Sequence, residues 1–235
     1  MRRPDEFLAE PAGVLTIDAL AARAAALTGG GRRAILGITG SPGAGKSTLV
    51  AALLARLPAL LPPDAVAHVP MDGFHLADVA LARIGRLQAK GAPDTFDAGG
   101  YVALLRRLRT AEDDPAEDVV YAPMFERDLE QPLAGAIPVP RAARLVLTEG
   151  NYLLLDQGRW AEVRLLLDEV WFCAPRPQAR LAQLTARHVE FGKDPAHAAA
   201  WVAGVDEPNA ELVESTRERA DLVIPAALLE SLPPA

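Results

Sequence analysis

Residues 40–47 read Gly-Ser-Pro-Gly-Ala-Gly-Lys-Ser and fit the pattern G-x-x-x-x-G-K-[ST] at every position. An apolar run of β-strand type, residues 34–39, leads into this glycine-rich loop. Residues 46–57 follow it with helical periodicity, up to Pro58. In that context the glycines let backbone N–H groups turn toward phosphate, and the helix N-terminus adds positive potential. The pattern predicts an ATP-binding loop made of Gly40, Ser41, Pro42, Gly43, Ala44, Gly45, Lys46, Ser47 and Thr48.

Two side chains of this loop have predicted roles of their own. Lys46 is expected to reach the β- and γ-phosphates, and the Ser47 hydroxyl is expected to bind Mg²⁺. ATP and Mg²⁺ are therefore the expected cofactors. A Gly-rich turn that fits the pattern by chance is the alternative, and the flanking strand and helix argue against it.

The rest of the chain alternates between strand and helix patterns. Several strand candidates are apolar throughout, which is typical of a parallel sheet covered by helices on both faces. We therefore expect an α/β fold in a single domain, residues 1–235, with an N-terminal helix within residues 1–31. Residues 119–125 suit an extended segment, and the proline-rich stretch to Pro140 suits a loop or an edge strand. Further strands are expected at residues 65–71, 145–148, 168–173 and 222–224, and helices at 16–27, 76–88, 101–110, 178–191, 195–203 and 208–219.

Composition restricts the kinds of partner. The net charge of −7 argues against a nucleic-acid coat, and no apolar run approaches membrane-spanning length. Cys173 is the only cysteine, so no disulfide can form within the chain. Since the first residues also lack the apolar core of a signal peptide, we expect a cytoplasmic protein with no nucleic-acid or membrane partner. A homodimer is compatible with this composition.

A phosphate-binding loop alone does not separate kinases from other nucleotide-binding proteins. GTPases usually read guanine with Asn-Lys-x-Asp, but the only asparagines, Asn151 and Asn209, do not precede a lysine. Elimination favours a small-molecule kinase. An NTP hydrolase that drives a partner and a nucleotide-binding regulator without turnover remain the alternatives.

Two acidic residues follow strand candidates and have predicted roles in the chemistry. Asp72 lies at the carboxyl end of the second strand candidate, where parallel sheets bind their ligands. A carboxylate there can accept the proton of an attacking hydroxyl, although it can also cap a turn. Glu149 ends the apolar run 145–148 and is expected to act on Mg²⁺, directly or through water. His75 and Asn151 are candidate acceptor contacts near these acids.

Four segments together resemble one family. Residues 40–48, 71–75, 90–97 and 148–154 look like the superfamily of uridine kinase, phosphoribulokinase and type I pantothenate kinase. Within it, the chain is most similar to the nucleoside/nucleotide-kinase-like branch with fructose-transport-system kinases. The resemblance covers residues from about 33 to 224.

The resemblance implies a strand order of the 2-3-1-4-5 type and a small helical lid at about residues 176–205. It implies that Asp72 is the catalytic base and that Asp97 binds hydroxyls of the acceptor. Arg187 and Arg180 resemble lid cations that act with Lys46 in catalysis, and Lys193 follows them. The alternative for these arginines is a solvated helix face.

The same resemblance bears on the phosphate acceptor. Residues 121–127 lie where uridine kinases carry Tyr-Asp-Phe and then a His and an Arg, but only Tyr121 and Arg127 are kept here. Tyr121, Arg127 and Glu130 are candidate acceptor contacts, with a plain surface hairpin as the alternative. Asn209 is expected to reach the adenine or to cap its helix. We therefore expect an ATP-dependent phosphotransferase with an alcohol group as acceptor, ranking a sugar-like metabolite before a nucleoside and pantothenate.

Overall fold

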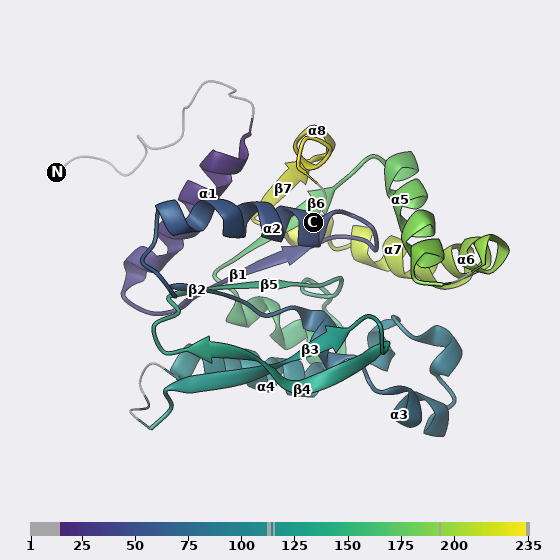
Figure 1. Cartoon of the computed structure of the whole chain (residues 1–235), viewed down its shortest axis with the longest axis horizontal. Helices are drawn as coiled ribbons and strands as arrows, with labels where there is room; N and C mark the ends of the chain where they lie inside the picture. The colour runs from purple at the N-terminus through teal and green to yellow at the C-terminus, as the bar shows by residue number, and fades with distance from the viewer. Residues whose placement is uncertain (1–14, 112–113, 115, 193, 234–235) are drawn as a thin grey trace.

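A parallel sheet of five strands forms the centre of the computed structural model, which describes residues 15–111, 114, 116–192 and 194–233 (Figure 1). Its order is β2-β5-β1-β6-β7, with every neighbouring pair parallel. Counted along the chain within this sheet, that is the expected 2-3-1-4-5 order, so the predicted α/β fold is confirmed. The strands are β1 Ala34–Thr39, β2 Val66–His68, β5 Leu145–Glu149, β6 Glu169–Ala174 and β7 Leu222–Pro225.

Helices cover both faces of this sheet. One face packs against α1, α2 and α8, through a core that contains Leu20, Leu49 and Leu228. The opposite face packs against α4 and α7, through Leu105 and Val213. The helices are α1 Ile17–Ala26, α2 Lys46–Arg56, α3 Asp78–Arg83, α4 Ala98–Thr110, α5 Pro177–Glu190, α6 Pro195–Trp201, α7 Glu207–Glu214 and α8 Ala226–Leu229.

The proline-rich stretch forms a hairpin outside the central sheet. Strands β3 Val119–Glu126 and β4 Gln131–Pro140 pair antiparallel, with a register shift between Ala122 and Met124. In Figure 1 this hairpin lies beside α4, on the side of the sheet away from α1 and α2. It also approaches the turn after β2, because a Cβ on Gly73 would lie 2.3 Å from the Pro123 carbonyl oxygen. The hairpin is therefore held against the segment that carries Asp72.

Two expected elements near Asp72 are shorter than the sequence pattern predicts, and the helix expected at residues 208–219 also ends early, at Glu214. The strand expected at residues 65–71 ends at His68, and Met71–Phe74 form a 3₁₀ turn. Pro70, which has no N–H to donate to a ladder, begins that departure from the sheet. The helix expected at residues 76–88 spans only Asp78–Arg83, since Gly85 takes a left-handed φ of 68° just after it. Asp72 thus lies in a tight turn beyond the strand rather than at its last residue.

The expected lid region holds three helical pieces. Helices α5 and α6 are followed by a π-helical segment, Val202–Asp206, that continues into α7. Single π-turns of this kind are frequent at functional sites.

Lys193 and residues 1–14 of the expected N-terminal segment lie outside the described residues. Within the described part of the chain, helix α1 begins after its cap Thr16, whose side chain accepts a hydrogen bond from Ala19 N.

Candidate active site

The glycine-rich loop connects β1 to α2 at the carboxyl end of the sheet, beside β5 and β6. Gly40 has a φ of 147°, and a Cβ at this position would lie 2.8 Å from the Cys173 carbonyl oxygen. Gly43 has a φ of 77°, and its Cβ would press on α5 at Arg180 and Leu184. Both positions therefore require glycine for conformation and for close packing. The loop is fixed between β6 and α5 by contacts that larger residues would break.

Lys46 is the first residue of α2, and its side chain reaches back to the loop. Its ammonium donates to Gly40 O at 2.9 Å, to Ser41 O at 3.1 Å and to Asn151 Oδ1 at 2.7 Å. Burial lowers the pKa of Lys46, and the charges of Glu149 and Asp72 oppose that shift. The two acids that the sequence singled out therefore both act on the predicted phosphate-binding lysine.

The expected metal ligands are adjacent. Ser47 Oγ donates to Glu149 Oε2 at 2.9 Å, because Glu149 pairs with Ile38 at the end of β1. His68, which sequence reasoning missed, places Nε2 3.5 Å from Glu149 Oε1. It reaches there because β2 is the neighbour of β5, a pairing that no local sequence pattern reveals. Among the described residues there is no group of three or more His, Cys, Asp or Glu side chains that could hold a metal.

Asp72 lies in the 3₁₀ turn after β2 and is partly open to solvent. Its Oδ2 atom is 3.9 Å from Arg127 Nη2, which comes from the turn between β3 and β4. Arg127 also lies over the ring of Phe191, at the end of α5, with 5.8 Å between guanidinium carbon and ring centre. Arg127 therefore lies between the predicted base and the expected lid.

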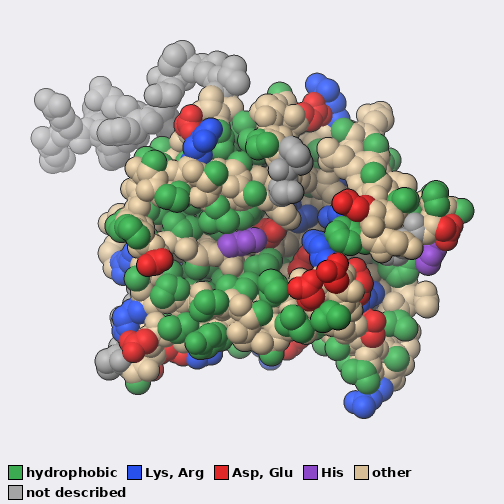
Figure 2. All heavy atoms as spheres, viewed as in Figure 1, with side chains coloured by type: hydrophobic (Ala, Val, Ile, Leu, Met, Phe, Trp, Pro, Cys, Tyr) green, Lys and Arg blue, Asp and Glu red, His purple; other side chains and the backbone are tan. Residues whose placement is uncertain are grey.

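The two arginines expected in the lid have different surroundings. Arg187 is half-buried, and its pKa is lowered by burial and by the charge of Arg127, while Asp72, Asp206 and Glu149 act the other way. Arg180 is buried, and it donates to Pro42 O at 3.1 Å and to Glu207. Arg187 thus lies within electrostatic reach of the predicted base, whereas Arg180 holds the outer side of the loop. Figure 2 shows basic and acidic side chains meeting in a hollow of this face.

His75 is packed among aromatic rings. Its ring centre is 4.0 Å from that of Phe96 and 4.6 Å from that of Phe125, and Nδ1 donates to Asp72 O at 2.8 Å. Burial lowers the pKa of His75, with the charge of Asp72 and the hydrogen bond opposing that effect. The His75 ring therefore joins the Asp72 turn to the hairpin.

The other acceptor candidates are more dispersed. Asp97 caps α4, because its Oδ1 accepts from Gly100 N at 2.7 Å. Tyr121 is 57% exposed and lies between Val120 and Ala122, which are buried. Glu130 has a φ of 53°, and its carbonyl oxygen accepts from Lys90. The role of each as an acceptor contact stays a prediction.

The two asparagines also have defined places. Asn151, expected to contact the acceptor, has its side-chain oxygen on Lys46, and its carbonyl oxygen accepts from Thr39 Oγ1 at 3.1 Å. Asn209 is buried in the first turns of α7. Sequence reasoning also missed Glu207 and Glu214 of α7, whose side chains contact Arg180 and Ser41. Their spacing of seven residues in an amphipathic helix was the available signal.

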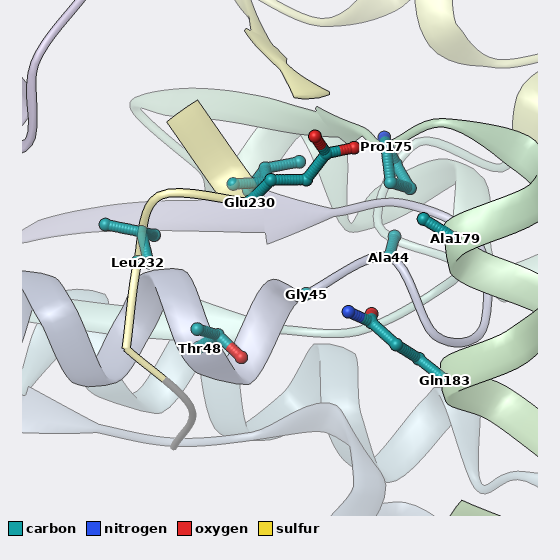
Figure 3. Close-up of a pocket in the computed structure, with 9 residues that line it drawn as sticks. Ala44, Gly45, Thr48, Pro175, Ala179, Gln183, Glu230 and Leu232 are labelled. Atoms are coloured by element: carbon teal, nitrogen blue, oxygen red, sulfur yellow. The ribbon is translucent and has the colours of Figure 1, made fainter. Parts of the chain in front are cut away.

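A cavity of about 350 Å³ adjoins the loop on the side of α5 and the C-terminal segment (Figure 3). Gly45 and Thr48 form one wall, and Gln183 points from α5 toward them. Leu229 and Glu230 come from the end of α8 and the residue after it. Since it borders the first turn of α2, the cavity is open to a ligand that also contacts the loop.

A separate observation concerns the membrane. No helix in the described ranges has both the length and the hydropathy that crossing a bilayer requires.

Comparison with known proteins places these features in a family. The family model described as methylmalonyl Co-A mutase-associated GTPase MeaB matches residues 16–65, which hold α1, the loop and α2. The curated "Putative uridine kinase C227.14" of Schizosaccharomyces pombe is 32% identical over 183 residues, covering 76% of each protein. This second match extends well beyond the loop.

Solved structures agree. The crystal structure described as a "putative fructose transport system kinase" from Silicibacter sp. TM1040 has a TM-score of 0.79 at 34% identity, covering 90% of this chain and 100% of the other. YFH7 from Saccharomyces cerevisiae, described as a "putative P-loop containing kinase with a circular permutation", has a TM-score of 0.75, covering 90% and 98% of the two chains. At 17% identity, that second likeness shows the fold alone.

These relatives confirm the resemblance drawn from the four motifs. Since the relatives are named as kinases, they support an ATP-dependent phosphotransferase. The chain belongs to the family of P-loop kinases that includes the putative uridine kinase of Schizosaccharomyces pombe and the putative fructose transport system kinase of Silicibacter.

Proposed function

We propose that this protein transfers the γ-phosphate of ATP to a hydroxyl group of a sugar-like metabolite. One observation carries the proposal: Asp72 lies within electrostatic reach of both Lys46 and Arg187, at the carboxyl end of the sheet. A kinase needs these three groups around one reacting centre, to activate the hydroxyl and to neutralise charge on the transferred phosphoryl group. A protein that only binds nucleotide does not need the carboxylate.

Asp72 is the proposed general base. Its side chain is 39% exposed, so an acceptor hydroxyl can approach it directly. Arg127 lies 3.9 Å from this carboxylate and can orient a hydroxyl or another acceptor oxygen. Arg187 is the proposed cation for the phosphoryl group, because it lies within electrostatic reach of Asp72 and Glu149.

Mg²⁺ is the proposed metal, held by Ser47 and Glu149. A hydroxyl and a carboxylate, 2.9 Å apart, are the hard oxygen donors that Mg²⁺ prefers, and Mg²⁺ commonly uses few protein ligands beside substrate phosphates. The ion would neutralise charge on the phosphates. A chelator should abolish turnover, and Glu149→Gln should raise the Mg²⁺ concentration that half-maximal turnover requires. Equal Mg²⁺ dependence in that variant would contradict the assignment.

The acceptor is proposed from the polar side chains of Asp97 and Arg127. Asp97 and Arg127 suit hydrogen bonds to hydroxyl groups, and the uridine-type base-reading set is incomplete at residues 121–127. A sugar or sugar-like polyol therefore ranks first, a nucleoside second and pantothenate third. Apolar alcohols should be rejected, because they would cover these polar groups without pairing them, which costs about 1–3 kcal/mol.

The test is an ADP-release screen of the purified protein against sugars, nucleosides, pantothenate and simple alcohols, with Lys46→Ala as the blank. ADP release stimulated by a sugar supports the proposal, and the product should carry one phosphate on a hydroxyl. Release that no hydroxyl compound stimulates would instead favour an NTP hydrolase that drives a partner protein. A nucleoside turned over well, with sugars at background, would overturn the acceptor ranking.

A further inference from the structure

The outer side of the phosphate-binding loop is fastened to helix α7. Ser41 is fully buried, and its Oγ donates to Glu214 Oε1 at 2.7 Å. A second acceptor of this hydroxyl, Ala210 O, lies farther away, at 3.5 Å. A hydrogen bond to a charged carboxylate is stronger than one between neutral groups. Glu214 therefore provides the main partner for a hydroxyl that has no access to solvent.

A second hydrogen-bonded link between the loop and α7 runs through Arg180 and Glu207. The Arg180 guanidinium donates to Pro42 O at 3.1 Å through Nη1 and to Glu207 Oε1 through Nη2. Arg180 is only 7% exposed. A planar guanidinium can make both bonds at once, which the single ammonium group of lysine does less well. Arg180 is thus the link between the loop and the start of α7.

Both acids lie on one face of α7. Glu207 and Glu214 are seven residues apart, about two helical turns, and Ala210 is buried between them. On α5, Arg180 and Arg187 have the same spacing, with buried Leu184 between them. Arg180 therefore holds α5 on the loop in the orientation that leaves Arg187 within electrostatic reach of Asp72 and Glu149.

We propose that Glu207 and Glu214, acting with Arg180, are positioning residues that hold the loop in its ATP-binding conformation. The inference rests on the proposed function, in which the loop binds ATP. These contacts use the Ser41 hydroxyl and the Pro42 carbonyl oxygen and occupy no backbone N–H group of the loop, where Ala44 N donates to Ser41 O at 3.0 Å. They also join the loop to the helix that carries Arg187. Arg180 acts here through the loop, not by contact with the transferred phosphoryl group.

A phosphate contact and a positioning role predict different effects at Arg180. If Arg180 acted by placing its positive charge on a phosphate, Arg180→Lys would keep most of the activity. Glu207→Ala would then not reproduce the loss of activity seen in Arg180→Ala. If Arg180 instead acts by linking Pro42 to Glu207, Arg180→Lys should weaken ATP binding nearly as much as Arg180→Ala. Glu207→Ala should then lower ATP affinity to the same extent.

The experiment measures ATP affinity by calorimetry without acceptor, and hydrogen exchange at residues 40–45. Ser41→Ala and Glu214→Ala should each weaken ATP binding about 5- to 30-fold, the effect of losing one or two kcal/mol. The double variant should be no weaker than either single one, because both remove the same bond. Glu214→Gln, which keeps an acceptor oxygen, should restore most of the affinity. Glu211→Ala, an exposed change on the same helix, is the matched control.

Faster exchange confined to residues 40–45 in Glu214→Ala and Glu207→Ala, with exchange in the strands of the central sheet equal to that of Glu211→Ala, would support the inference. Additive losses in the double variant, or ATP affinity unchanged in Glu214→Ala and Glu207→Ala, would overturn it. These readouts need no acceptor, so the sugar assignment can fail without affecting them. If wild type binds no ATP at all, the proposed function fails first.

Discussion

Lys46 and Asn151 are joined by a hydrogen bond of 2.7 Å between the ammonium group and the side-chain oxygen. The bond links the phosphate-binding loop to the segment after β5. Two residues before Asn151, at the end of β5, Glu149 accepts from Ser47. Residues 149–151 thus contact both Lys46 and Ser47, and they position the predicted phosphate-binding lysine beside the predicted metal ligands.

Replacement of Lys46 by alanine should abolish turnover while the fold survives. The change removes the cation expected at the β- and γ-phosphates, and it leaves the sheet and both cores intact. ADP release and far-UV circular dichroism check the two parts of this prediction. Turnover equal to wild type would refute the assignment of the loop.

Asp72→Asn should lower kcat by about 10²–10⁴-fold, the usual contribution of a general base. Asparagine is nearly isosteric with aspartate but does not accept the hydroxyl proton. ATP affinity should hardly change, because Asp72 lies in the turn after β2 and not in the loop. If ATP binding collapsed while the remaining rate stayed high, Asp72 would be a metal ligand or a structural residue instead.

Stability should fall as the pH is lowered through the range of His75. Burial lowers the pKa of His75 below its ordinary 6.5. The unfolded chain then binds the proton more tightly, so stability is lost as the pH falls from about 6.5 toward the folded-state pKa. The thermal midpoint of wild type should drop between about pH 7.5 and about pH 5.5.

His75→Gln should flatten that drop, and His197→Gln, at an exposed residue of α6, is the control. A profile that is equally steep in His75→Gln would mean that other groups carry the dependence.

Arg33 should be important for stability. It is buried, and its guanidinium donates to Ala143 O at 2.7 Å, Leu108 O at 3.1 Å and Pro140 O at 3.0 Å. These carbonyls belong to the ends of α4 and β4 and to the connection before β5. Arg33→Ala would leave them without this donor, and we expect a loss of about 2–4 kcal/mol in the free energy of unfolding.

Arg32→Ala is the matched control for that change. The neighbouring Arg32 pairs with Asp168 at the surface, so its loss should cost less than about 1 kcal/mol. Urea unfolding of the two variants makes the comparison. Similar midpoints for both would show that the buried bonds contribute little.

Local patterns predicted the elements around the loop well. Residues 34–39 form β1 as expected, and the helix expected at 46–57 is α2, Lys46–Arg56. The patterns failed where a contact with a distant part of the chain determines which residues meet at the site. His68 meets Glu149 only because β2 pairs with β5, and Ser41 meets Glu214 across 173 positions of sequence. Periodicity reports which face of an element is apolar, and it does not report which element will cover that face.

The last prediction separates two roles of Asp97. The sequence resemblance makes it an acceptor ligand, while in the structure its Oδ1 caps α4 through Gly100 N. Asparagine caps a helix about as well as aspartate, but alanine does not and costs about 0.5–2 kcal/mol. Asp97→Asn should therefore keep the thermal midpoint and lose only the charge.

If Asp97 binds the acceptor, Asp97→Asn should raise the acceptor KM far more than the ATP KM. Asp97→Ala should do the same and also lower the thermal midpoint. The expected result is thus a separation of effects: stability depends on the cap, and acceptor affinity depends on the carboxylate. An unchanged acceptor KM in Asp97→Asn, with a lower midpoint in Asp97→Ala, would leave Asp97 as a helix cap. The acceptor site would then have to be built from Asp72 and Arg127, which are the polar groups already 3.9 Å apart beside the hairpin.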